Sequence, residues 1–448
     1  MDSGHLKMFL RKPEVIRLAI FIALLHALFF LFALNSNNIY LSVDSREYLH
    51  QVENLKHHFS WYAGDWNKPH EDFLETRRPP AYAFFIAFLR LFSASDFLVL
   101  FVQNILSIIN LLLTCFLVSV IMRKQIINYV FVIALLLFPT QLIYANMIMA
   151  DVLFQTFLLL AVFFFYRFSV ERKTIFFFNF NLMIAFAVLT KPVMYLFPIL
   201  ILVLCLLWYS KKMLQLKDVF FVTLPVLVVL ALCFYNYRMT GLFHYSSVNQ
   251  KFLSEYGAYL SVGERGDADA QFKIDSILSK ANKMPDFKSY SVFINEASND
   301  LIKQNLGRFL WMQSKGMVQF FVDHGRWDLY AFFVNPDHTQ LQGWKYFYQK
   351  DGLAGVWFYL KGFNVLLIGY LVLITLMNVW LLFALLRFFL NTTVNYNFRL
   401  LIACLVFYQV ALTSVVGCSR YRMAIYPFLL MSAAIVVNSK EKKNVLLG

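Results

Sequence analysis

Long apolar runs separated by short polar segments dominate the chain. A helix needs roughly 20 apolar residues to cross the hydrocarbon core of a bilayer, and about ten runs approach that length. The predicted spans are Val15–Leu34, Asp96–Met122, Ile126–Ala145, Asp151–Phe168, Ile175–Leu189, Val193–Trp208, Val219–Tyr237, Phe363–Phe389, Leu400–Val416 and Met423–Val437. The pattern therefore predicts an all-α polytopic membrane protein with about ten transmembrane helices.

Two polar segments interrupt this pattern. Residues 36–80 are expected to form the first external loop, and the short apolar stretch 81–92 that follows is expected to lie as a helix at the membrane interface. Residues 239–362 are too many for a simple connection, so they are expected to fold as a small external subdomain. The predicted units are an N-terminal bundle (1–238), this subdomain and C-terminal transmembrane helices (363–448).

Composition agrees with a membrane protein. The chain has 448 residues, of which 60% are hydrophobic and 15% are charged, whereas about 25% is usual for soluble proteins. In a soluble protein, the net charge of +14 would suggest a nucleic-acid partner. Here the Lys/Arg bias of cytoplasmic loops, together with anionic lipid or phosphate ligands, explains the charge, and no nucleic-acid partner is expected.

Lys and Arg are unevenly distributed between the two sides of the predicted bundle. Both terminal tails and the short loops on their side are basic, while the short connections on the other side hold only Lys191, Arg420 and Arg422. The positive-inside rule then places both termini in the cytoplasm, as expected for a multi-pass protein of the cytoplasmic (inner) membrane. The external face gathers the polar groups of interest. These are Asp44, Arg77-Arg78, Tyr144–Asp151, Lys191, residues 238–361 and Ser419-Arg420-Tyr421.

Two carboxylates are expected at the external face, Asp44 and Asp151. A carboxylate at the mouth of a transmembrane bundle is costly unless it is paired or functional. Asp44 is either a general base for an acceptor hydroxyl or amine, or a cap for the helix that begins near Ser45. Asp151 either positions substrate or caps the fourth span. A divalent metal shared by the two is not favoured, because no His/Asp/Glu cluster has ligand spacing; no cofactor is expected.

Cations from distant connections are expected at the same face. Lys191 lies between two apolar runs with no carboxylate nearby in the sequence, which favours an anionic ligand such as phosphate or a side chain that snorkels to the interface. Arg420 and Arg422 oppose the charge bias of outer connections, and phosphate binding would explain them; Arg77 and Arg78 are candidates to join. Cations beside a carboxylate base suit transfer from a phosphate-linked donor.

Six motifs, in order along the chain, resemble those of one family. They are Asp44 with Tyr48, Arg78-Pro79-Pro80-Ala81-Tyr82, Pro139 to Asp151, Thr190-Lys191-Pro192, Tyr235-Asn236 through Phe243, and Ser419 to Met423 with Tyr426-Pro427. The chain is similar to the GT-C superfamily of integral membrane glycosyltransferases, specifically the bacterial branch related to lipid A aminoarabinose transferases and protein O-mannosyltransferases. The resemblance implies a GT-C-like fold.

The resemblance also implies a chemistry. The donor is a sugar on a polyprenyl phosphate, transferred with inversion at the outer face to a lipid, glycan or protein acceptor. Asp44 is expected to activate the acceptor. The residues expected to bind the donor phosphate are Lys191, Arg420, Arg78 and Tyr421, and those expected to position substrate are Asp151, Tyr48, Tyr82 and Asn236. Asp44-Ser45 stands where the protein O-mannosyltransferases carry Asp-Glu, so the acceptor class is left open.

Two other functions remain open on the sequence alone. A transporter or flippase of a lipid-linked saccharide would share the bundle and the basic cavity, but such proteins carry internal repeats and polar residues at the midplane. An O-antigen-type polymerase or ligase usually has its key external loop late in the chain. Within 239–362, several residues are unranked candidates to shape an acceptor site. These are Glu255, Tyr256, Asp323, His324, Arg326, Trp327 and Asp328.

Overall fold

The computed structural model describes residues 3–36, 38–40, 42–122, 129–210, 214–248, 252–263, 268–334, 351–355, 357 and 365–445. Within these ranges the chain is helical and contains no strand. Seven helices or helix pairs are long and apolar enough to cross a membrane. They are α2 (Pro13–Ser36), α6 (Asp96–Met122), α9 (Asp151–Glu171), Pro192–Ser210, Leu216–Thr240, α21 (Val365–Phe389) and α22 (Tyr396–Thr413). The class of the protein is therefore a multi-pass helical membrane protein, as the apolar runs predict.

Two predicted spans are shorter than a full crossing. α10 (Thr174–Thr190) has 17 residues, and the apolar part of α24 (Tyr426–Val445) covers only Tyr426–Asn438. α10 ends where Lys191-Pro192 begins, because proline cannot continue the helical hydrogen bonding. The predicted total of ten spans is thus not established, whereas the interfacial stretch after the first loop forms a short apolar helix, α5 (Ala81–Arg90).

The predicted span Ile126–Ala145 is wrong for its described part. Instead of one helix there are two, α7 (Tyr129–Leu136) and α8 (Thr140–Ala145), separated at Pro139. Residues 126–128 lie outside the described residues. Proline at 139 lacks the N–H that would continue α7, and every residue of α8 is buried. The break allows α8 to carry Tyr144 into the interior at one end of the bundle.

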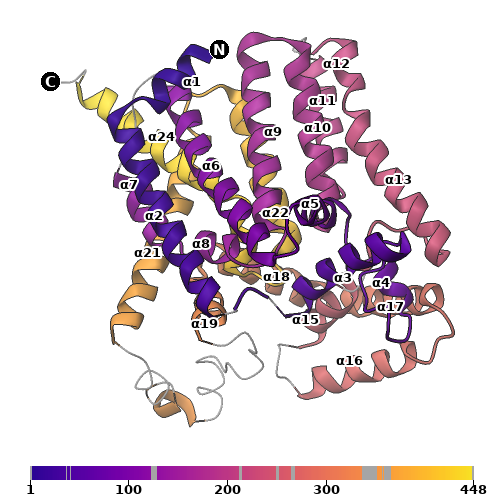
Figure 1. Ribbon diagram of the computed structural model, residues 1–448. Coiled ribbons are helices and arrows are strands. Elements are labelled where there is room, and N and C mark those ends of the chain that lie inside the picture. Colours follow the sequence, from indigo (N-terminus) through magenta and orange to yellow (C-terminus); the bar gives the residue numbers. More distant parts are fainter. Residues whose placement is uncertain are drawn as a thin grey trace.

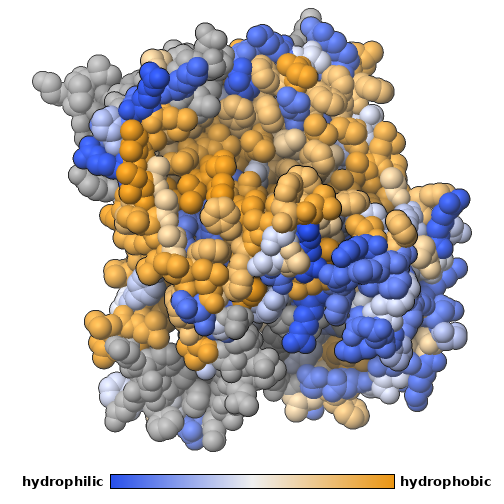
Figure 2. Space-filling view, in the orientation of Figure 1, coloured by the Kyte–Doolittle hydropathy of each residue, from blue (hydrophilic) through white to orange (hydrophobic). Residues whose placement is uncertain are grey.

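The bundle has two chemically different ends (Figure 1). α1 (Ser3–Leu10) and the last turn of α24 lie at one end; α3 (Ser42–His58), α4 (Asp72–Glu75) and the helices of the second polar segment lie at the other. In Figure 2, an orange apolar surface covers the middle of the visible face, and blue polar residues gather above it and at its lower right. The helices of the second polar segment are η2 (Phe252–Gly257), α15 (Ala258–Val262), α16 (Ala268–Ala281), α17 (Phe287–Gln304), α18 (Leu306–Val322) and α19 (Arg326–Phe333).

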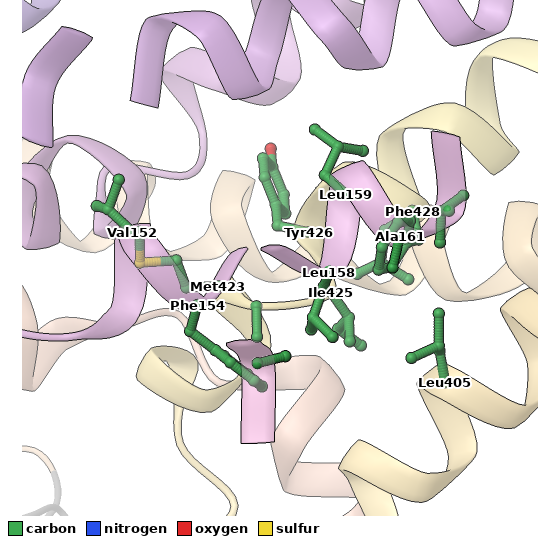
Figure 3. Packing of buried hydrophobic residues seen from close by; sticks show 14 of the residues in the cluster. Val152, Phe154, Leu158, Leu159, Ala161, Leu405, Met423, Ile425, Tyr426 and Phe428 are labelled. Carbon is green, nitrogen blue, oxygen red and sulfur yellow. The ribbon is translucent and has the colours of Figure 1, made fainter. Parts of the chain in front are cut away.

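α9 occupies the centre of the bundle. Its sequence is apolar around most of its circumference, which is typical of a buried helix, and it packs most extensively against α10 and α6. Figure 3 shows α9 residues such as Val152 and Phe154 in one cluster with Met423 and Ile425 from the chain around α23 (Ser419–Met423). This packing fixes the N-terminus of α9 next to α23.

Neutral polar side chains tie the interior together. His26 Nε2 lies 2.9 Å from Ser107 Oγ, which also accepts a hydrogen bond from Gln141 Nε2 at 2.8 Å. Gln141 and Gln155 exchange hydrogen bonds of 2.9 and 2.8 Å, and Gln155 Nε2 donates to Met423 O at 2.6 Å. Because buried amides must find partners, this network holds α2, α6, α8, α9 and α23 in one arrangement.

Candidate functional site

The first turns of α3 present acidic side chains on one face. Asp44 and Glu47 are three residues apart, so they lie side by side on the helix surface, and Tyr48 follows on the same face. Asp44 lies in the first turn of α3, where the helix dipole favours a negative charge. Glu47 was not among the predicted site residues; its spacing from Asp44 was the available signal.

Asp44 joins two arginines that come from distant parts of the chain. Arg78 Nη2 donates to Asp44 Oδ1 at 2.5 Å, and Arg420 Nη1 donates to Asp44 Oδ2 at 2.9 Å. Arg78 Nε donates to Glu47 Oε2 at 2.6 Å, while Arg77 Nε donates to Glu47 Oε1 at 2.5 Å. Both arginines of the pair before Pro79 are therefore anchored to α3 by Glu47.

A second ion pair continues this chain of charges. Lys191, which caps α10, donates from Nζ to Asp151 Oδ1 at the start of α9 at 2.6 Å. The sequence offers no carboxylate close to Lys191, but the α9–α10 hairpin supplies Asp151 from 40 residues away. Arg420 Nε lies 3.6 Å from Asp151 Oδ2. The Arg420 guanidinium thus stands between the carboxylates of Asp44 and Asp151, the two that were considered as a shared metal site.

The site alternates positive and negative groups in a largely buried setting. Its cations are Arg77, Arg78, Arg420 and Lys191, and its anions are Glu47, Asp44 and Asp151. One positive charge is in excess among these side chains. Asp151 Oδ2 and Arg420 Nε are buried without a hydrogen bond to a described residue. These two atoms face each other at 3.6 Å, so they form an ion pair without a hydrogen bond, and a buried ionic group that is not fully hydrogen-bonded is costly to stability.

These charges open into a pocket of about 210 Å³. Asp44 keeps 28% of its side chain exposed and lines the pocket. Apolar residues cover the rest of the wall, so that a small charged area adjoins a surface suited to a hydrocarbon chain. The lining residues are Asp44, Tyr48, Arg77, Arg78, Lys191, Pro192, Val193, Tyr195, Val248, Leu412, Thr413, Arg420 and Tyr421.

The ionisation of Asp44 is set by its arginines. Burial alone would raise the pKa of Asp44, but the charges of Arg78 and Arg420 and their hydrogen bonds outweigh it and hold that pKa well below its ordinary value. Asp44 is therefore a carboxylate at neutral pH. With both oxygens bound to arginine, it is a weak proton acceptor.

The remaining predicted site residues divide into two groups. Tyr48 and Tyr421 line the pocket, and the Arg78 guanidinium lies 5.1 Å from the centroid of the Tyr48 ring. Tyr82 and Asn236 do not line it. Tyr82 is buried behind Tyr48 and donates to Gln103 Oε1 at 2.5 Å. Asn236 holds a turn by donating to His244 O and Tyr245 O.

Arg422 differs from Arg420, although the sequence suggests one reason for both. Arg422 is buried and points away from the pocket, donating to Phe320 O and Phe321 O at 2.9 and 2.8 Å and to Asp323 O at 2.7 Å. These bonds satisfy carbonyl groups at the C-terminus of α18. Arg422 thus anchors α23 to α18, and Arg420 is left to face the carboxylates.

A cluster around Asp328 anchors the other side of α23. The Ser419 hydroxyl donates to Asp328 Oδ2, Tyr144 Oη donates to Asp328 Oδ1 at 2.9 Å, and Ser419 N donates to Asp323 Oδ2 at 2.6 Å. Burial raises the pKa of Asp328 to about 6, and the hydrogen bonds from Ser419 and Tyr144 only partly offset it. Asp323 and Asp328, left unranked on the sequence, therefore position α23 and do not line the pocket.

The fold and the site define a multi-pass helical membrane protein with a charged pocket at one end of its bundle. Comparison with models of known protein families gives no match, and comparisons with functionally characterised proteins and with solved structures give none either. The chemistry of the pocket therefore rests on its own residues.

Proposed function

We propose that the chain is a membrane glycosyltransferase of the GT-C kind, with about ten spans. It moves a sugar from a polyprenyl-phosphate donor to an acceptor at the outer face of the cytoplasmic membrane. The observation that carries the proposal is the meeting of Asp44, Arg78, Lys191 and Arg420 in one pocket with apolar walls. The cations suit a phosphate, and the apolar wall suits the lipid that bears it.

In the proposed reaction, the charged residues of the pocket act in a single displacement at the anomeric carbon of the donor sugar. The acceptor hydroxyl attacks the anomeric carbon while the bond from that carbon to the phosphate oxygen breaks, and its electron pair leaves with the polyprenyl phosphate. Asp44 takes the hydroxyl proton. Arg420, Lys191 and Arg78 stabilise the charge that develops on the leaving phosphate. The anomeric configuration inverts because there is a single displacement.

Under the proposal, binding of the donor makes Asp44 a stronger base. A donor phosphate brings oxygens that compete with Asp44 for the N–H groups of Arg78 and Arg420. When the guanidinium groups turn to the phosphate, Asp44 loses the partners that lower its pKa. Under the proposal, donor binding thus prepares the base, and the excess positive charge of the site favours the exchange.

The proposed topology follows from charge. Lys and Arg favour cytoplasmic termini. The pocket is lined by Asp44 of α3, and α3 lies at the end of the bundle away from α1 and the last turn of α24 (Figure 1). The catalytic face is therefore proposed to be external, where a donor carried on the outer leaflet and a lipid, glycan or protein acceptor meet. No cofactor is invoked.

Loss of the gene tests the proposal most directly. We expect extracted glycolipids and glycans of a deletion strain to lose the mass of one sugar unit, restored by the intact chain and not by Asp44→Asn. Purified protein in vesicles should form a new glycosidic bond from a labelled polyprenyl-phosphate sugar. Unchanged masses, with labelled lipid moved across the bilayer and no new bond, would instead show a flippase.

A further inference from the structure

A second, larger cavity lies between the first loop and the helices α16 and α17. Its volume is about 580 Å³, within the range of roughly 300–1,000 Å³ that ligand pockets span. It is formed by the segment around α4, the end of α16 and the first turns of α17. The lining residues are His70, Glu71, Asp72, Phe73, Ser247, Ala281, Asn282, Met284, Pro285, Asp286, Phe287, Tyr290, Ser291, Ile294 and Asn295.

A thin wall separates this cavity from the charged pocket. Phe73 lines the outer cavity, and the guanidinium of Arg77, which lines the charged pocket, lies 5.5 Å from the centroid of the Phe73 ring. In the segment that lies against Phe73, Ser247 lines the outer cavity and Val248 lines the charged pocket. Ser247 Oγ donates to Phe73 O at 2.6 Å, which holds the two segments together. A ligand in the outer cavity is therefore adjacent to the Arg77 side of the charged pocket.

The two cavities have opposite charge. The outer cavity is lined by the carboxylates of Glu71, Asp72 and Asp286 and contains no Lys or Arg among its lining residues. Glu71 and Asp72 are exposed and make no ion pair with a described residue. Such a surface repels phosphate and other anions, so the outer cavity does not duplicate the charged pocket. It favours a ligand that is neutral or carries an amine.

Polar groups without partners point to a hydroxyl-rich ligand. Ser291 forms part of the floor with only 3% of its surface exposed, and its hydroxyl makes no hydrogen bond with a described residue. The amides of Asn282, which is exposed, and Asn295, which is half-buried, also line the cavity. A buried hydroxyl is normally hydrogen-bonded, which leaves Ser291 open to a ligand partner, and carboxylates and amides together offer both acceptors and donors to sugar hydroxyls.

Aromatic rings complete the surface. Phe73, Phe287 and Tyr290 line the cavity between its polar rim and its floor. Rings of this kind provide flat apolar area against which the C–H faces of a sugar pack. The rim is held in place before any ligand arrives, since the His70 ring stacks on Tyr62 with centroids 4.3 Å apart and Asp286 accepts from Ser289 N at 2.7 Å.

We infer that the outer cavity is a saccharide subsite that holds an extended neutral or amine-bearing glycan acceptor beside the charged pocket. This inference rests on the proposed function for its link to transfer, but saccharide binding is independent of it. The glycan occupies the outer cavity with one part and passes over the Phe73–Arg77 wall with the other, so that its terminal hydroxyl reaches Asp44. Of the acceptor classes considered, the cavity selects a glycan.

Binding to the full-length protein in detergent tests the inference without a donor. The probes are the tetrasaccharides of glucose, N-acetylglucosamine and glucosamine, with tetragalacturonate and tetralysine as comparisons, and the readout is calorimetric Kd. We expect at least one neutral or amine-bearing tetrasaccharide to bind. Phe287→Ala and the double variant Glu71→Gln/Asp72→Asn should each raise its Kd at least tenfold, while Glu296→Gln, an exposed neighbour on α17, should not change it.

The outcomes separate the two proposals. If the tetrasaccharide binds and the cavity variants weaken it, but no sugar is transferred, the subsite stands and the proposed function fails. If transfer occurs, the same variants should raise the KM for a saccharide acceptor more than the KM for the donor. The inference is overturned if no tetrasaccharide binds, if only tetragalacturonate or only tetralysine binds, or if the cavity variants bind like the intact chain.

Discussion

Two carboxylates, those of Asp328 and Asp44, bind neighbouring residues of the short helix α23, but the charge of their partners and their exposure differ. Ser419 donates to Asp328, and the next residue, Arg420, donates to Asp44. The partners of Asp44 are guanidinium groups, whereas those of Asp328 are neutral hydroxyls from Ser419 and Tyr144. The pKa of Asp44 is consequently lowered, while burial raises the pKa of Asp328 to about 6.

This difference distinguishes Asp44, which is available to a ligand, from Asp328, which positions the backbone of α23. Asp44 remains charged and lines a pocket. Its partners, Arg78 and Arg420, are also able to bind an anion that enters this pocket. Asp328 is buried, lines neither of the two cavities described above, and holds the backbone that presents Arg420. The sign of a pKa shift at a buried carboxylate therefore follows from the charge of its partners, and geometry decides which of the two carboxylates is able to meet a ligand.

The largest expected effect comes from removing the charge of Asp44. Under the proposed function, Asp44→Asn should lower the rate of sugar transfer by about 10²–10⁴-fold, the range typical of a lost general base, because the amide still accepts hydrogen bonds but cannot take a proton. Asp328→Asn should lower it less than about tenfold, since its role is to position α23. Transfer from a labelled polyprenyl-phosphate sugar provides the measurement.

A matched control for Asp44→Asn lies on the same helix. Glu53→Gln removes an exposed carboxylate of α3 and should leave transfer unchanged. Thermal melting of each purified variant shows whether the fold is retained. Equal losses in Asp44→Asn and Asp328→Asn, with both variants folded, would contradict the distinction between the two carboxylates.

The next effect concerns the donor. Lys191→Met should raise the KM for the polyprenyl-phosphate sugar by roughly 10–100-fold, the loss expected for one charge-assisted contact to phosphate. Lys173→Met provides a control at the other end of α10, where the side chain is exposed and 67% of its surface is accessible. If Lys191→Met needs no more donor than the intact chain, Lys191 has no part in phosphate binding.

Local sequence was sufficient for much of the fold. The long helices α2, α6, α9 and α21 follow from apolar runs, because in a bilayer a helix must satisfy its own backbone hydrogen bonds. The break between α7 and α8 does not follow from the apolar pattern, although Pro139 lies in it. A run of apolar residues does not reveal that the chain turns inward at the proline, since that depends on the neighbours that bury α8.

The sequence indicates which residues belong to the candidate site, but it does not indicate which of them form ion pairs with one another. Asp44 at the end of an apolar run, Lys191 with no carboxylate nearby in the sequence and Arg420 against the charge bias of outer connections each stand out locally, with Arg78 as a candidate to join them, and the structure brings the four together. That Asp151 is the partner of Lys191 depends on the packing of α9 against α10. The anchoring role of Asp328 depends on Ser419, 91 residues away, and no local pattern contains such a contact.

A smaller effect should appear in the pH dependence of stability. The pKa of Asp328 is raised from 3.8 to about 6 in the folded protein, so the folded state keeps its proton more tightly than the unfolded chain does. The contribution of Asp328 to the free energy of unfolding should therefore fall as pH rises from about 4 to about 6, by about 1–2 kcal/mol after relaxation is allowed for.

Asp328→Asn serves as the reference for this measurement, because asparagine does not titrate. The melting temperature of the intact chain, minus that of Asp328→Asn, should decrease between pH 4.5 and pH 7. The charges near Asp328 are those of Asp323, Arg420 and Arg422, and all three are present in the reference variant. A difference that stays constant over this range would mean that Asp328 does not ionise there.

The smallest effect tests the backbone that holds Asp328. Gly325 precedes α19 with φ +70°, and a Cβ at this position would lie 3.1 Å from Thr140 Oγ1 and 3.2 Å from Ser419 Oγ. Gly325→Ala should lower the free energy of unfolding by about 1 kcal/mol, the cost of a left-handed conformation for a non-glycine residue, and should weaken the pH dependence above. Gly307→Ala, where a Cβ meets no atom, is the control and should not lower the melting temperature. If the two variants melt alike, the contact of Ser419 with Asp328 tolerates displacement, and α23 is positioned mainly by Arg422.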